Sequence, residues 1–180
     1  MKNILIILFF VLLSLPFSFS QEKGFKLENV LVVAQQDKME DRYSLEVSLI
    51  ELLRQYNIKT MASLNVIKQG GSPKILLNDS VQNALKQQGI DTYMLISVRG
   101  YDKKFKPSEQ LKSLEDELEA GHLFPVYREN ITSVTFSVTF YRDEKPVHNE
   151  LIKIGATGSR EDVLKKLMKK LDKLLRKEWT

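Results

Sequence analysis

Histidine is the side chain that most often moves protons or binds metals at neutral pH, and this chain contains only His122 and His148. Glu119 and His122 have the Glu-x-x-His spacing found in some metal sites on helices. Gly121 interrupts that spacing at an expected helix end, and no matching second half lies nearby in the sequence. The chain also has no cysteine, which excludes thiolate ligands and thiol catalysis. We therefore predict no metal site.

The sequence contains no recognisable motif for catalysis by other residue types. A Ser-His-Asp hydrolase of the α/β type places its serine in a G-x-S-x-G turn, and the sequence contains none. The carboxylates in 115–119 fall on the polar face of an expected helix, which indicates a solvated surface. We predict no catalytic or cofactor-binding residue and no cofactor, and we do not expect an enzyme. Catalysis is unsupported rather than excluded, since the acid pair of a glycosidase leaves little local signature.

Two segments could bind anions. In "GATGSRED" (155–162), glycines precede a helix start, where free backbone N–H groups can hold a phosphate. The Gly-Lys-Ser/Thr ending of phosphate loops is missing, so we interpret Ser159 as the helix cap, paired with Asp162. The second segment, "KKLMKKLDKLLRKEW" (165–179), is dense in lysine and striped with leucine.

The apolar residues of this closing segment fall on one face of a helix: Leu164, Leu167, Met168, Leu171, Leu174 and Leu175. Burying such a set contributes about 9–18 kcal/mol before entropy is subtracted, whereas a lysine–lipid contact contributes about 1 kcal/mol. The stripe is therefore expected in the core, with the lysines in water. An acidic protein or an anionic glycan could be bound by Lys165, Lys166, Lys169, Lys170 and Lys173.

Two segments carry modification signals. "NDS" (78–80) and "NIT" (130–132) fit the N-glycosylation sequon, which matters only in a eukaryotic secretory pathway. "DSV" (79–81) resembles the O-glycosylation signal of Bacteroidota, with Ser80 as the acceptor. We prefer a helix start here, with Asp79 and Gln82 at capping-box spacing.

The first residues predict export. Lys2 provides a positive start, 4–15 is an unbroken apolar run apart from one serine, and Pro16 ends it; 18–20 supply small residues for cleavage. This is the build of a secretory signal peptide, since a spanning helix needs about 20 apolar residues. Cleavage after Ser20 leaves a chain with no cysteine for lipid attachment, which we expect to be soluble and secreted or periplasmic.

Residues 21–180 have the length of a single domain, which can build a core without disulfides. Because Lys2 is the only charged residue in 1–20, the net charge of the remainder falls from +4 to +3, with acidic and basic residues mixed. Neither this charge nor an exported location favours nucleic acid as a partner.

The rest of the chain alternates strands and helices. A buried strand is expected within 25–34, and a helix over 40–56 carries leucines on one face. Similar endings, "QYNIKTM" and "QQGIDTY", place Asn57 and Gly89 at left-handed helix caps, each followed by a strand. The further elements expected are strands over 58–64 and 92–99, a helix from 78 and a short surface helix over 108–120.

"ITSVTFSVTFY" (131–141) alternates strictly, which predicts a strand with Val and Phe on one face and Ser and Thr on the other. A turn at 142–146 and a return strand over 147–154 complete a hairpin. We expect the Ser/Thr face to be open to solvent or covered by a partner. The last helix begins at Ser159.

These elements predict an α/β fold with α+β character. It has one mixed sheet of about five strands in the order β-α-β-α-β-(α)-β-β-α, built with right-handed crossovers. Helices are expected mainly on one face, with the amphipathic carboxyl-terminal helix packed on the sheet. The 101–130 segment is interpreted as an insertion, because it is long for a connection.

The chain over 25–177 resembles the periplasmic α/β domains of the CsgG, PelC and Tol-translocation amino-terminal type. The resemblance lies in "NVLVVA", "DRYSLEVSLIELLRQYNI", "LKQQGIDTYMLISV", the Ser/Thr-rich hairpin and the closing helix. It implies a cell-envelope protein that acts in secretion or assembly by docking partners, often as a ring, and it implies no catalysis. The signal resembles those of secreted Bacteroidota proteins. Many such domains carry a lipidated cysteine that this chain lacks, and no functional residue transfers.

We therefore predict a non-catalytic exported envelope accessory protein that acts by protein–protein binding or assembly, with another envelope protein or with itself. The expected contact surfaces are the Ser/Thr face and the 101–130 insertion. One alternative is a small-ligand-binding protein or hydrolase with a pocket near His122, Tyr127 and Arg128. The other is a peripheral membrane-surface protein that uses the basic carboxyl-terminal helix.

Overall fold

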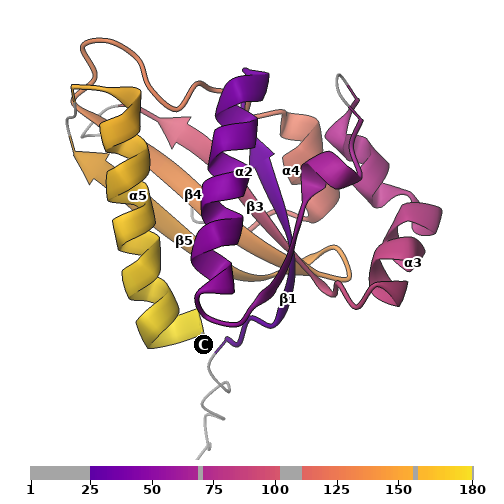
Figure 1. The fold of residues 1–180 in the computed structure, drawn as a ribbon. Helices are drawn as coiled ribbons and strands as arrows, with labels where there is room; N and C mark the ends of the chain where they lie inside the picture. Colours follow the sequence, from indigo (N-terminus) through magenta and orange to yellow (C-terminus); the bar gives the residue numbers. More distant parts are fainter. Residues whose placement is uncertain (1–24, 69–70, 102–110, 156–157, 180) are drawn as a thin grey trace, which may run out of the picture.

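The computed structural model describes residues 25–68, 71–101, 111–155 and 158–179. They form a five-stranded sheet with the spatial order β2-β1-β3-β4-β5, flanked by helices (Figure 1). Its strands are β1 (Asn29–Gln35), β2 (Lys59–Ala62), β3 (Thr92–Gly100), β4 (Ser133–Arg142) and β5 (Lys145–Gly155). The expected signal peptide and its cleavage site lie outside the described residues.

The sheet is mixed, as predicted. β1 lies parallel to both β2 and β3, whereas β4 is antiparallel to β3 and to β5. The connections out of β1 and β2 contain the helices α2 (Met39–Arg54) and α3 (Asp79–Gln87), because parallel neighbours need a crossover. The antiparallel β4–β5 pair needs only a tight turn, formed by Asp143 and Glu144 at positive φ. The predicted α/β fold with one mixed sheet is confirmed.

Two long helices cover one face of the sheet. In Figure 1, α2 and α5 (Arg160–Leu174) lie side by side in front of the strands. Alternate apolar residues of the strands meet them, since successive side chains of a strand point to opposite faces. The core between these layers includes fully buried side chains from every element involved, among them Val32, Leu49, Ile96, Phe136 and Leu171.

The leucine stripe of α5 is buried, as predicted. Leu167 and Leu171 are fully buried and Leu175 is 1 % exposed, while the lysines between them are exposed. The apolar face of α5 is therefore used within the chain, and its charged face is left to the surface. Among the described residues, no helix combines the length and the apolar composition needed to cross a bilayer.

The end of the chain returns to the start of β1. A short π-helical turn (Leu175–Trp179) follows α5, and its buried Trp179 ring lies against Phe140 with centroids 4.8 Å apart. The backbone N–H of Leu27 donates to the Trp179 carbonyl at 2.9 Å, which ties the two ends of the described chain together. Trp179 is the only tryptophan in the sequence, so its fluorescence reports on this junction.

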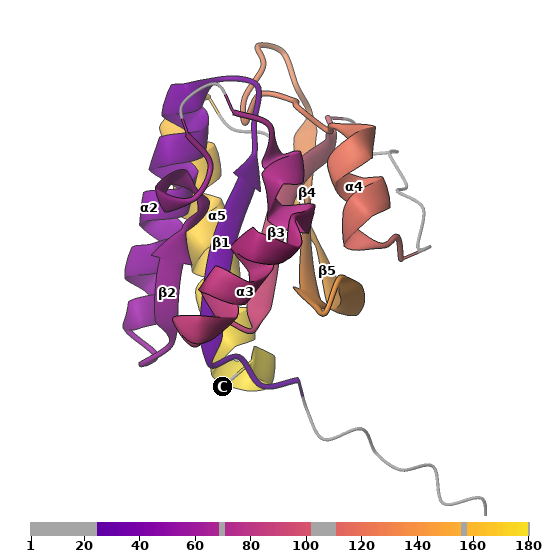
Figure 2. The same ribbon diagram turned by 90° about the vertical axis from the view of Figure 1, so that its right-hand side faces the viewer.

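Shorter helices cover part of the opposite face. Figure 2 shows α3 and α4 (Leu114–Ala120) on the side of the sheet away from α2 and α5. A 3-10 turn, η3 (Pro73–Leu77), belongs to the same side, and Leu76, Leu85 and Leu118 form a second, smaller core there. The expected helix over 108–120 is shorter than predicted, because its cap is Ser113; 108–110 lie outside the described residues.

The two matched helix endings have the predicted geometry. Asn57 and Gly89 have φ of 59° and 80°, which is the left-handed region. Each is followed by a buried isoleucine, Ile58 or Ile90, whose backbone N–H donates back to the helix. One local stop signal thus ends both helices and directs the chain into a strand.

The start of α3 differs from the expected capping box. Asn78, not Asp79, caps the helix, accepting hydrogen bonds from the N–H of Ser80 at 2.9 Å and from its hydroxyl at 2.6 Å. Gln82 donates to the carbonyl of Leu76 instead of returning a bond to the cap. The cap falls one residue earlier because Asn78 has extended backbone geometry, whereas Asp79 is already helical.

The Ser/Thr face of β4 is buried, which corrects the expectation of solvent or a partner there. Ser133, Thr135, Ser137 and Thr139 are at most 6 % exposed. β4 lies between β3 and β5, so a neighbouring strand flanks its hydroxyl side chains on each side. Asn149 of β5 donates to Ser137 at 2.9 Å and to Thr139 at 2.6 Å. The hydroxyls are therefore part of the interior and not a contact surface.

A buried ion pair attaches α2 to the sheet. The fully buried Glu46 carboxylate accepts hydrogen bonds from Arg42 Nε at 3.2 Å and from the backbone N–H groups of Ala34 at 3.1 Å and Leu64 at 3.3 Å. The Ser63 hydroxyl donates to the same carboxylate. Because both oxygens are engaged, the buried charge is compensated and its role is structural.

Candidate functional site

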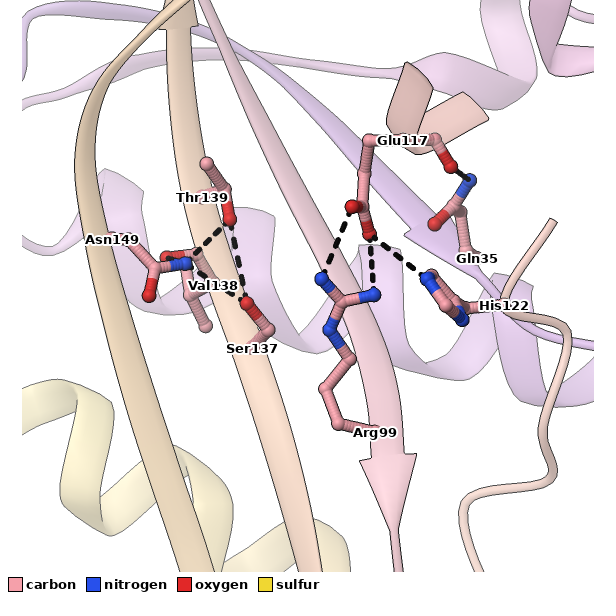
Figure 3. Close-up of polar contacts among 8 residues, drawn as sticks. All are labelled: Gln35, Arg99, Glu117, His122, Ser137, Val138, Thr139 and Asn149. Atoms are coloured by element: carbon pink, nitrogen blue, oxygen red, sulfur yellow. Dashed lines mark hydrogen bonds and ion pairs between the residues drawn. The ribbon is translucent and has the colours of Figure 1, made fainter. Parts of the chain in front are cut away.

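A polar cluster joins α4 to the end of β3 (Figure 3). The Glu117 carboxylate, 3 % exposed, binds the Arg99 guanidinium through two contacts, 2.7 Å to Nη1 and 3.1 Å to Nη2. His122 Nε2 lies 3.8 Å from Glu117 Oε1, and the Gln35 amide donates to the Glu117 carbonyl at 3.4 Å. Residues from β1, β3, α4 and the segment after α4 thus converge.

The position of this cluster is one where α/β sheets often bind ligands. β1 and β3 are parallel neighbours, and the helices next to them in the chain, α2 and α3, lie on opposite faces. Such a switch in direction opens a crevice beyond the carboxyl ends of the two strands. Here Gln35, Arg99 and Glu117 occupy that position and contact one another.

The electrostatics of the cluster favour the uncharged form of His122. Burial lowers the pKa of His122, the Arg99 and Lys112 cations lower it further, and Glu117 opposes them, so the imidazole is neutral at pH 7. Glu117 meets Arg99 with both oxygens and is not a free base. The contacts of Glu117 with Arg99 and Gln35 therefore hold α4 against the sheet.

A row of rings links His122 to Arg128. The Arg128 guanidinium lies 4.5 Å from the centroid of the Tyr101 ring. Phe124 stands between Tyr101 and His122, with ring centroids 6.3 Å and 6.4 Å away. The Tyr101 hydroxyl donates to the Pro125 carbonyl at 2.6 Å, and burial raises its pKa to about 12. These side chains contact one another, and three pockets on the described surface are lined by other residues.

Other residues singled out from the sequence have structural partners. The Tyr127 hydroxyl donates to the Gly158 carbonyl at 3.2 Å. Glu119 pairs with Lys74 at 2.9 Å and not with His122, so the Glu-x-x-His spacing does not form a site. Within the described ranges, no group of three or more metal-ligating side chains could hold an ion.

The glycine-containing segment before α5 is a helix cap. The Ser159 hydroxyl accepts a hydrogen bond from the Asp162 N–H at 3.2 Å, as predicted. Arg160 pairs with Asp41 of α2, so the helix start is engaged with another part of the chain. Residues 156–157 lie outside the described residues.

A basic groove runs between α5 and β5. Ile154 and Gly155 contribute to it from β5, and its volume is about 180 Å³. The α5 side is lined by Lys166, Lys169, Lys170 and Lys173. Lys170 Nζ donates to the Lys153 carbonyl at 2.7 Å, which places one ammonium against the backbone of β5. Four of the five lysines singled out from the sequence therefore border one groove.

β5 is the last strand of the sheet. It spans 11 residues and, among the described strands, pairs with β4 alone. Val147 and Leu151 are 43 % and 38 % exposed. Ile152 and Ile154 belong to the core under α5, so Val147 and Leu151 point to the other face. Sequence reasoning expected this strand but missed its edge position, because sheet order is not a local property.

Comparisons with known proteins give similar solved structures but no family. No protein-family model matches the chain, and no curated protein matches it. Among solved structures, lipoprotein GNA1162 from Neisseria meningitidis is similar over 84 % of this chain and 99 % of that chain, with 12 % identity and a TM-score of 0.47.

PelC from Paraburkholderia phytofirmans, a dodecamer, is similar over 84 % of this chain and 93 % of that chain, with 13 % identity and a TM-score of 0.47. A competence-damaged protein (CinA) superfamily protein from Enterobacter cloacae covers 82 % of this chain and 80 % of its own, with 13 % identity and a TM-score of 0.33. PelC, whose type of domain the sequence resembles, is thus among the solved structures similar to this chain. At this identity and TM-score, the similarity transfers no family, role or partner.

Proposed function

We propose that this chain is an accessory protein of the cell envelope that docks another protein along the edge of β5. The observation that carries the proposal is the edge strand β5, which pairs regularly with β4 from His148 to Gly155 and shifts in register next to Pro146, with Val147 and Leu151 exposed. Edge strands are usually short or protected, because their unpaired backbone groups pair with other chains. A partner segment can add a strand to such an edge and gain main-chain hydrogen bonds. The signal peptide predicted from the sequence supports a partner outside the cytoplasm.

The available contacts suit a complex of moderate affinity. Complete burial of a valine or leucine side chain contributes about 1.5–3 kcal/mol, so covering the exposed parts of Val147 and Leu151 contributes about 1–2.5 kcal/mol together. Each new backbone hydrogen bond adds about 0.5–1.5 kcal/mol net. The cost of association offsets part of this gain, which favours a reversible complex.

Two observations weigh against the alternatives. A membrane-bound helix would insert the leucines of α5, but Leu167 and Leu171 are buried against the sheet. For a hydrolytic pocket near His122, the Glu117 carboxylate beside the imidazole is engaged by Arg99, and the three pockets described above are lined by other residues.

Site-specific photo-crosslinking in the native envelope tests the proposal. A photo-reactive amino acid at Val147 or Leu151 should give a discrete adduct with another protein. The matched control is Ile75, which is 41 % exposed on η3, and it should give no such adduct. Only uncrosslinked monomer from both β5 positions would overturn the proposal. Co-expression with a differently tagged copy shows whether the adduct is a second copy of this chain.

A further inference from the structure

We propose that the segment docking on β5 is an extended strand in which acidic and apolar residues alternate. This inference rests on the proposed function, since it specifies the partner of the same edge. A strand added to β5 presents alternate side chains to the two faces of the sheet. On one face, the side chains of the added strand lie toward the lysines of α5, which favours acidic residues. On the other face, they lie beside Val147 and Leu151, which favours apolar residues.

The lysines that border the groove form an ordered row. Lys166, Lys170 and Lys173 are at positions i, i+4 and i+7 of α5, which places them on one side of the helix. All three are exposed, and all three line the groove together with Ile154 of β5. A partner strand beside β5 would therefore lie under a row of positive charge.

The spacing of these charges fits a strand. Lys166 and Lys170 are separated by four helical residues, a rise of about 6 Å along α5. Side chains on one face of a strand repeat every two residues, or about 6.6–6.8 Å. Two carboxylates at alternate positions of an added strand can therefore each meet one ammonium.

Lys170 already shows how the contact forms. Its ammonium donates to the neutral carbonyl of Lys153 on β5. A carboxylate on the incoming strand offers a charged acceptor at the same place, and charge-assisted hydrogen bonds are roughly twice as strong as neutral ones. To bind this carboxylate instead of the Lys153 carbonyl, only the Lys170 side chain has to move, and α5 stays in place.

The opposite face of β5 favours apolar partners. Val147 and Leu151 are exposed there and are two strand repeats apart. Apolar residues at alternate positions of the added strand would cover both, and charged residues there would lose solvation without a partner. Acidic side chains toward α5 and apolar side chains away from it therefore define the expected sequence pattern.

Titration with synthetic peptides tests this inference. The probe is a peptide of about nine residues with alternating glutamate and valine, and the control peptide carries glutamine in place of glutamate. Fluorescence anisotropy should show the glutamate peptide binding at least about tenfold more tightly than the glutamine peptide, with the difference shrinking as salt rises. Equal affinities, or no binding of the glutamate peptide, would overturn the inference.

Charge-reversal variants assign the binding to the groove. Lys166→Glu combined with Lys170→Glu should weaken the glutamate peptide by about tenfold or more, since two attractive contacts become repulsive. Lys68→Glu combined with Lys165→Glu changes the net charge equally at exposed positions outside the groove and should stay within about twofold. Circular dichroism and Trp179 fluorescence verify folding in both. Equal weakening by both pairs would contradict the assignment.

The crosslinking experiment separates this inference from the proposed function. If Leu151 gives the same adduct at undiminished yield in the Lys166→Glu, Lys170→Glu background, edge docking stands and the acidic strand is refuted. If the peptide binds but no envelope protein crosslinks, the groove chemistry stands and the proposed function fails. Binding of phosphatidylglycerol vesicles that needs the same lysines, without peptide binding, would assign the groove to a membrane surface instead and overturn the inference.

Discussion

Truncating Leu171 to alanine tests whether α5 is held by its buried stripe, which determines where the lysines lie. Leu171 is fully buried in the core between α5 and the sheet. Replacing such a leucine removes its transfer free energy and leaves a cavity, which together cost about 2–5 kcal/mol. Neighbours from both layers surround the site, so little collapse into the cavity is expected. We therefore expect the free energy of unfolding to fall by about 3 kcal/mol.

Urea unfolding followed by Trp179 fluorescence measures this loss. Trp179 belongs to the same core cluster, so its emission changes when α5 leaves the sheet. With a slope of about 2 kcal/mol per molar urea, the unfolding midpoint should fall by about 1–2 M at unchanged slope. Far-ultraviolet circular dichroism provides a second probe, and coincident curves verify a single cooperative transition.

Lys165→Ala is the matched control, because Lys165 is an exposed residue of the same helix. Its free energy of unfolding should stay within about 0.5 kcal/mol of the unmodified chain. A Leu171→Ala midpoint equal to that of the unmodified chain would refute the packing account. The lysine row bordering β5 would then have no fixed position, and the proposed groove would lose its basis.

Three further predictions concern α4 and the helix caps. Glu117→Ala should lower the free energy of unfolding by about 3 kcal/mol, because it leaves the Arg99 guanidinium without its buried partner. Glu119→Ala removes an exposed ion pair with Lys74 and should cost less than about 1 kcal/mol in the same urea assay. Equal losses of stability in the two variants would contradict a structural role for the Arg99–Glu117 pair. The lowered pKa of His122 means that the unfolded chain binds the proton more readily, so stability should fall as the pH drops through about 6.5. Thermal melting across that range should show this loss in the unmodified chain and a smaller one in His122→Gln; identical profiles would contradict it. Gly89→Ala should destabilise by about 1–2 kcal/mol in thermal melts, because its φ of 80° is costly for alanine, and a neutral result would contradict the assigned cap.

Local sequence patterns predicted the structure correctly where it depends on residues within one or two helical turns. The leucine spacing of α5 and the left-handed positions of Asn57 and Gly89 depend on nearby residues, and all were predicted correctly. The predicted capping box of α3, with Asp79 as the cap, was wrong by one residue. Asn78 and Asp79 are adjacent residues of similar capping preference, and the choice between them depends on backbone geometry that the sequence leaves open.

The candidate site was predictable only in part. Lysines such as Lys166 and Lys170 were identified from composition and spacing, because a helix places them outside the leucine stripe whatever it packs against. The groove they border also needs Ile154 of β5, which reaches α5 only because the hairpin lies beneath it. Likewise, Arg99 and Glu117 are 18 residues apart and belong to different elements. Their contact could not be predicted, because no local periodicity relates them.

By itself, the sequence determined the types of the elements, their order and the polar and apolar faces of each, because side-chain periodicity is a property of a single strand or helix. Only the tertiary structure decided which strand lies in the middle of the sheet and which lies at its edge. The alternation of β4 is the same in either place, yet its hydroxyls are buried because β5 lies beside it. Val147 and Leu151 lie on β5, the last described strand of the sheet, and are exposed. Strand order depends on contacts between distant segments, and a pattern within one segment contains no record of them.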